Sequence, residues 1–134
     1  MIVPLSKRIW RPKLTLEFLQ WFGFGGAALV WAAQHVIGFG ATLARCGAGG
    51  VRFGIDLHTW ELTTFIVALA FVLAAEASAI IVARRTWGVE HDGPPPDGRR
   101  HFFALAAMIG NLLFLVVILM SGLSTLTFDP CRQG

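Results

Sequence analysis

Three long apolar runs constrain this chain more than any other feature. They cover residues 21–43, 62–83 and 102–123, and Glu76 is the one Asp, Glu, Lys or Arg within them. A transmembrane helix needs about 20 predominantly apolar residues. Each run must be helical, because lipid cannot pair open backbone groups and three segments cannot close a barrel. The sequence therefore predicts an all-α integral membrane protein with three transmembrane helices, forming a single membrane domain over residues 1–134.

The composition supports this class of protein and excludes several others. The chain has 134 residues, of which 55% are hydrophobic and 14% are charged, whereas soluble domains average about 25% charged residues. Three spans leave only short loops, without room for a soluble catalytic domain, a nucleotide-binding fold or a nucleic-acid module. We therefore expect no enzyme activity and no nucleic-acid partner, although the net charge is +3.

The basic residues are distributed unevenly among the predicted loops. Eight of the eleven precede the first run or flank the loop at residues 84–101: Lys7, Arg8, Arg11, Lys13, Arg84, Arg85, Arg99 and Arg100. The other three are Arg45, Arg52 and Arg132. Because short loops rich in Lys and Arg stay in the cytoplasm, the N-terminus and residues 84–101 are predicted inside and the C-terminus outside. The N-terminal cations would contact anionic lipid of the bilayer.

The first run is rich in small residues that do not fall on one stripe of a helix. Gly23 with Ala27 and Ala28 with Ala32 have the spacing at which membrane helices approach one another closely. The other two helices of the chain would not use all of these positions. Two explanations stay open, namely packing within a three-helix bundle and packing against a partner protein.

A few polar side chains interrupt the spans. They are Gln34, His35, Glu76, Ser78 and Asn111. Ionisable groups at membrane depth are costly and are often functional. A rise of about 1.5 Å per residue places His35 in the outer half of the membrane, and Glu76 and Asn111 together in the inner half. The predicted pair is therefore Glu76 with Asn111.

These polar residues allow more than one role. Joined by water, His35, Glu76 and Asn111 would form a path for protons or metal ions. In a structural role, Glu76 is protonated or paired within an assembly, and His35 donates a hydrogen bond to another helix. The remaining histidines are His58, His91 and His101. None of them matches His35 in depth, so we expect no bis-histidine haem and no other cofactor in this chain alone.

The two cysteines follow the outer ends of the first and third runs. Cys46 and Cys131 would both face an oxidising compartment, where a disulfide bond persists. The sequence favours such a bond between the two. The alternative is that both thiolates and His58 bind copper, which prefers soft ligands.

Three short motifs carry a family resemblance. They are Trp31-Ala32-Ala33-Gln34-His35, Asn111-Leu112-Leu113-Phe114-Leu115 and Asp129-Pro130-Cys131. The chain resembles a group of small three-span bacterial membrane proteins that are often encoded beside haem-copper cytochrome c oxidase genes. The resemblance implies a multi-pass protein of the bacterial inner membrane that works with terminal respiration.

Two functions follow as expectations. The first is a non-catalytic accessory subunit or assembly factor of a respiratory membrane complex of the cytochrome c oxidase type, with the first helix packed on oxidase subunits. The alternative is a small oligomeric membrane protein that conducts protons or metal ions through His35, Glu76 and Asn111.

Overall fold

The computed structural model consists of three long helices and one short helical turn. Helix α1 spans Leu5–Cys46, α2 spans Leu57–Arg85, α3 spans Asp97–Thr127, and the 3-10 turn η1 spans Pro130–Arg132. The structure describes residues 5–47, 50, 54–90 and 93–132, with side chains from Thr15 onward. Within those residues there is no β-strand, which confirms the predicted all-helical class.

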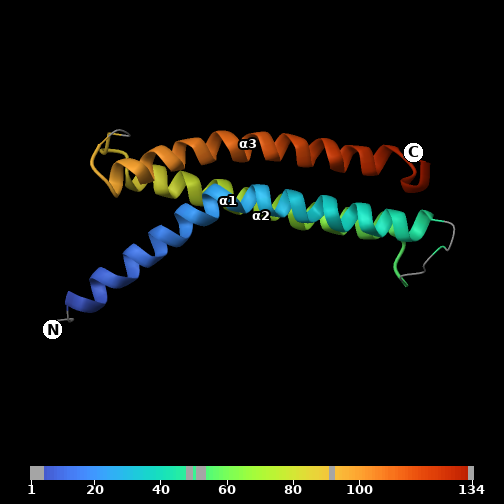
Figure 1. Ribbon diagram of the computed structural model, residues 1–134, viewed down its shortest axis with the longest axis horizontal. Coiled ribbons are helices and arrows are strands. Elements are labelled where there is room, and N and C mark those ends of the chain that lie inside the picture. Colours follow the sequence, from blue (N-terminus) through green and yellow to red (C-terminus); the bar gives the residue numbers. More distant parts are fainter. Residues whose placement is uncertain (1–4, 48–49, 51–53, 91–92, 133–134) are drawn as a thin grey trace.

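All three helices are long and apolar enough to cross a membrane. They lie side by side as one elongated bundle, and the N-terminal part of α1 diverges from it (Figure 1). The 42 residues of α1 correspond to about 63 Å at 1.5 Å per residue. That length is about twice the thickness of a bilayer core, so α1 is longer than one membrane crossing requires.

The helices continue past the predicted spans. Arg84 and Arg85 belong to the last turn of α2, and Arg99 and Arg100 belong to the start of α3, so the non-helical connection is shorter than residues 84–101. Arg84 and Arg85 lie near the C-terminus of α2, where cations interact favourably with the helix dipole. We call the end of the bundle that holds Arg84, Arg85, Arg99 and Arg100 the arginine end.

Local signals fix where α2 begins and where the next connection lies. Asp56 precedes α2 and accepts a hydrogen bond from the backbone N–H of Thr59 at 3.3 Å, as an N-terminal capping residue does. Gly54 has φ of 72°, a left-handed conformation that favours glycine. At the other end, the run Pro94–Pro96 lies outside helix because proline lacks a backbone donor.

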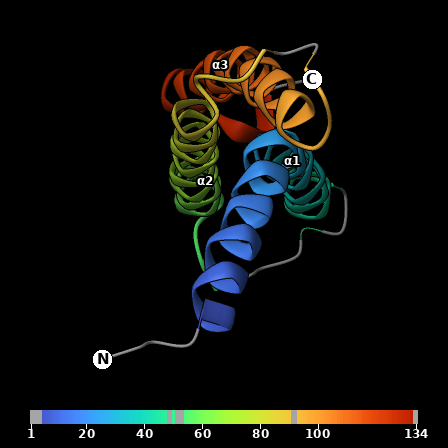
Figure 2. The ribbon, with the colours of Figure 1, turned by 90° about the vertical axis from the view of Figure 1, so that its left-hand side faces the viewer.

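The core between the helices is built from small residues. Figure 2 shows the three helices grouped around one another. Ala27 of α1 and Ala75 of α2 are fully buried, together with Val72 and Ile118. A methyl group added at Gly23 would lie 2.9 Å from the backbone nitrogen of Ala79. Helices α1 and α2 therefore touch backbone to backbone, which only glycine permits at this point.

Polar groups near the arginine end are paired across the helices. Buried His101 of α3 and Thr86, the residue after α2, are joined by a 2.9 Å hydrogen bond between Nδ1 and Oγ1. The neighbouring apolar cluster contains Val82, Ala83 and Ala104. Packing and satisfied hydrogen bonds together close this end of the bundle.

Candidate functional site

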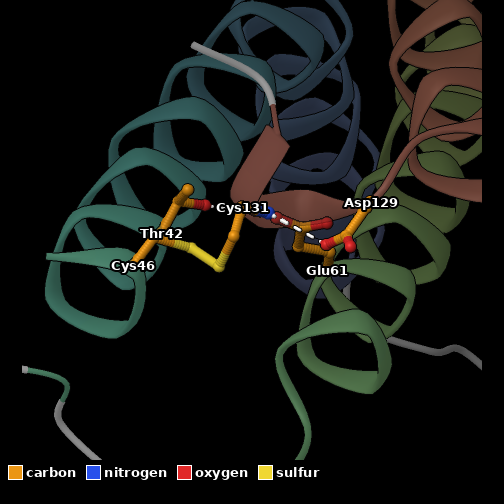
Figure 3. The surroundings of a disulfide bond; sticks show 5 residues. All are labelled: Thr42, Cys46, Glu61, Asp129 and Cys131. Atoms are coloured by element: carbon orange, nitrogen blue, oxygen red, sulfur yellow. Dashed lines mark hydrogen bonds between the residues drawn. A yellow bond between two sulfur atoms is a disulfide. The ribbon is translucent and has the colours of Figure 1, made fainter.

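A disulfide bond closes the opposite end of the bundle, which we call the disulfide end. Cys46 at the end of α1 is bonded to Cys131 in η1, with Cα atoms 5.4 Å apart (Figure 3). The predicted disulfide is confirmed. The two sulfur atoms are bonded to each other, so neither is a free thiolate. The alternative in which both thiolates and His58 bind copper is therefore wrong for the disulfide-bonded protein.

A hydrogen bond links α1 to α2 beside the disulfide. The hydroxyl of Thr42 donates to Oε1 of Glu61 at 3.2 Å, and Figure 3 shows this contact across the bundle. The other carboxylate oxygen of Glu61, Oε2, is buried and has no hydrogen-bond partner. Asp129 lies nearby in Figure 3, where it accepts a bond from the backbone N–H of Cys131 at 3.2 Å.

A polar cavity of about 530 Å³ lies next to this contact. All three helices line it. Its polar lining includes Gln34, His35 and Thr42 of α1, Glu61 and Thr64 of α2, and Thr125 of α3. The cavity is the main feature of the described residues at which polar side chains from all three helices converge, and we treat it as the candidate functional site.

His35 lies at this cavity and makes a hydrogen bond within its own helix. Its Nδ1 is 2.9 Å from the carbonyl oxygen of Trp31, and the two rings lie 4.8 Å apart between centroids. The expected bond from His35 to another helix is therefore not what the structure shows. The reason is geometric, because the carbonyl four residues earlier lies within reach of a helical side chain.

Glu76 and Asn111 lie together in the half of the bundle nearer the arginine end. Buried Asn111 donates through Nδ2 to the carbonyl oxygen of Gly23 at 2.9 Å, and the Glu76 carboxyl lies beside the Asn111 side chain. Oε2 of Glu76 is buried without a partner. The twelve residues from Gly23 to His35 correspond to about 18 Å of helix, so the structure does not bring His35 into this pair.

The remaining polar predictions are placed as follows. Buried Ser78 donates to the Ala74 carbonyl of its own helix at 2.8 Å, and Gln34 has a buried Oε1 without a partner. His58 is half-buried near the start of α2, and His91 and Arg52 lie outside the described residues. In the described part of the chain, no three side chains of His, Cys, Asp or Glu are grouped as metal ligands.

Sequence reasoning missed Glu61. It directly precedes the predicted second span at residues 62–83 and is therefore not among the polar residues that interrupt the spans. The available signal was the pairing of Cys46 with Cys131, which brings the end of α1 to the end of α3. The start of α2 must lie at that same end, which places Glu61 near Cys46 along the bundle but does not say which way its side chain points.

Comparison with known proteins does not indicate a function for this chain. No protein-family model, no curated protein and no solved structure matches this chain. The function must therefore be argued from the membrane-spanning helices, the surface of α1 and the polar cavity.

Proposed function

We propose that this chain is a non-catalytic accessory subunit or assembly factor of a respiratory membrane complex of the cytochrome c oxidase type, and that it binds its partner through α1. The observation that carries the proposal is the poor burial of α1. Within its most apolar stretch 6% of residues are buried, against 33% in α2 and 22% in α3. The helix with the most small residues therefore makes the least use of them inside the chain.

The glycines of α1 divide into two groups. Gly23 and Gly26 face α2 closely, whereas a methyl group added at Gly25 or Gly40 would meet nothing within 4 Å. Gly25 is two residues beyond Gly23, which is about 200° around a helix of 3.6 residues per turn. Small residues in a membrane helix allow another helix to approach closely. The face of α1 that points away from the bundle therefore suits a partner helix.

An apolar hollow also supports the proposal that α1 packs against a partner helix. It has a volume of about 420 Å³, and Gly40 and Ala41 of α1 and Trp60 of α2 contribute to its lining. A large side chain from a neighbouring helix fits such a hollow by van der Waals packing, which drives helix association in membranes.

The proposed orientation has the arginine end in the cytoplasm and the disulfide end outside the bacterial inner membrane. Two independent signals support it. Arg84, Arg85, Arg99 and Arg100 gather at one end of the bundle, as the positive-inside rule requires of the cytoplasmic side. The disulfide lies at the other end, and disulfides persist in oxidising compartments such as the periplasm. The choice of a respiratory partner follows from the resemblance described above.

Extraction of native membranes in mild detergent tests the proposal. We expect the chain to migrate on a native gel with a larger complex that shows haem absorbance. Gly25→Leu should release the chain from that complex, because a leucine side chain would separate α1 from the partner's helix. Gly110→Leu on α3 is the matched control, since a methyl group there also meets nothing within 4 Å. Migration of the unmodified chain as a lone monomer would overturn the proposal.

A further inference from the structure

Three threonine hydroxyl groups around the polar cavity have their protons engaged elsewhere. Thr42 donates to Oε1 of Glu61 at 3.2 Å, Thr64 donates to the backbone carbonyl of Glu61 at 2.9 Å, and Thr125 donates to the carbonyl of Ser121 at 3.2 Å. A hydroxyl has one proton and two acceptor lone pairs. These three threonines therefore offer acceptors, not donors, to anything in the cavity.

Two further acceptors at the cavity have no partner. Oε2 of Glu61 and Oε1 of Gln34 are both buried and unpaired within the described residues. His35 adds to this set. Its Nδ1 must donate to the Trp31 carbonyl, which can only accept, so Nε2 of the neutral ring is an acceptor. Acceptors from α1, α2 and α3 are thus among the groups that line the cavity.

Glu61 is the one carboxylate that lines the cavity, and it forms no ion pair within the described residues. Among the described residues the one ion pair is Arg100 with Asp97, at the arginine end. A charge near the membrane interior is costly unless it is paired or hydrated. A cation from outside the chain would supply the pairing that Glu61 lacks among the described residues.

We propose that this cavity binds a monovalent cation, with Glu61 as its anionic ligand and the hydroxyls of Thr42 and Thr64, which both bond to Glu61, as neutral oxygen ligands. One carboxylate balances one positive charge. Oxygen ligands suit hard cations and protonated amines, whereas transition metals prefer nitrogen and sulfur ligands. The volume of about 530 Å³ admits an alkali ion with several waters, at about 30 Å³ each, or a small organic ammonium.

This binding site goes beyond the proposed role as an accessory subunit. That role depends on the outward face of α1, and the cation site depends on the inward polar face at the disulfide end. Either can fail without the other.

Nuclear magnetic resonance on the full chain in lipid nanodiscs tests the site. One arm measures broadening of the ²³Na signal by the protein and its reversal by KCl. A second arm measures saturation transfer to methylammonium chloride. Reversal by KCl identifies an alkali-ion site, and saturation transfer with little sodium broadening identifies an organic ammonium site.

Matched variants make the result specific. Glu61→Gln should weaken binding at least tenfold, and its amide oxygen can still accept the Thr42 hydroxyl bond that joins α1 to α2. Glu76→Gln, which removes a carboxylate from the other half of the bundle, should bind as the unmodified chain does. Thr64→Val should weaken binding about two- to fivefold, with the helix intact.

Three results would overturn the proposal. They are the absence of sodium broadening together with the absence of methylammonium transfer, equal binding by the unmodified chain and Glu61→Gln, and equal loss in Glu61→Gln and Glu76→Gln.

Discussion

The two ends of the helix bundle are held together by different means. At the arginine end, Val82, Ala83 and Ala104 are buried, and the polar groups of His101 and Thr86 are bonded to each other. At the disulfide end, a covalent bond holds α1 to η1, and a cavity with unpaired acceptors separates the helices.

The packed arginine end therefore contributes to stability, whereas the disulfide end has unpaired polar groups that are available to bind a ligand. Around His101 and Thr86 no buried side-chain atom of the described residues lacks a partner, although Oε2 of Glu76, farther along the same half, does. A region closed by a disulfide can keep unpaired polar atoms, because the covalent bond constrains the chain where packing is incomplete. The following predictions test this division, from the largest expected effect to the smallest.

Loss of the disulfide should have the largest effect. The bond joins residues 85 positions apart, and a loop of that length is worth roughly 4 to 5 kcal/mol in the chain-entropy model. We expect reduction to lower the free energy of unfolding measured by SDS titration in mixed micelles. Cys46→Ser with Cys131→Ser should unfold as the reduced chain does and ignore reductant. A reduced chain as stable as the oxidised one would contradict the account of the disulfide end.

Gly23→Ala should destabilise the packed half by about 1 to 3 kcal/mol through overpacking. The added methyl would lie 2.9 Å from the Ala79 nitrogen, and backbone cannot yield as a flexible side chain does. Gly25→Ala is the control, because a methyl there meets nothing within 4 Å. The same unfolding titration measures both. Equal stability of the two variants would show that α1 and α2 do not approach closely at Gly23.

Asn111→Leu should cost about 1 kcal/mol, in the range measured for hydrogen bonds between membrane helices. The variant removes the bond from Nδ2 to the Gly23 carbonyl but keeps an apolar side chain of similar size. Proton flux into liposomes should be unchanged, since Asn111 has a structural role in this account. A drop in proton flux with unchanged stability would instead favour conduction through Glu76 and Asn111.

Thr86→Val and Thr64→Val compare the two ends with the same substitution. Thr86→Val leaves Nδ1 of buried His101 without its partner, so we expect a loss of about 1 kcal/mol. Thr64 donates only to a carbonyl of its own helix, so Thr64→Val should change stability by no more than about 0.5 kcal/mol. Thermal unfolding of both variants side by side checks the difference, and a larger loss for Thr64→Val would reverse it.

The sequence predicted the features that depend on position along a helix. Three apolar runs required three helices, the outer ends of two runs brought Cys46 to Cys131, and simple depth placed Glu76 beside Asn111. The features it missed depend on rotation about the helix axis. A helix that is apolar on every side carries no amphipathic signal of its orientation, so neither the meeting of Glu61 with Thr42 nor the bond of His35 to its own helix could be derived.

Cysteine labelling in membranes compares the two regions most directly. Ser121 lines the polar cavity, and Ser78 is buried with its hydroxyl bonded to its own helix. The native cysteines are paired in a disulfide, so Ser121→Cys and Ser78→Cys would each add one thiol. We predict that a cationic methanethiosulfonate reagent labels Ser121→Cys rapidly, faster than an anionic one does, and leaves Ser78→Cys unlabelled. Equal labelling at the two positions, or a preference for the anionic reagent at Ser121→Cys, would contradict the division between a packed end and an acceptor-lined cavity.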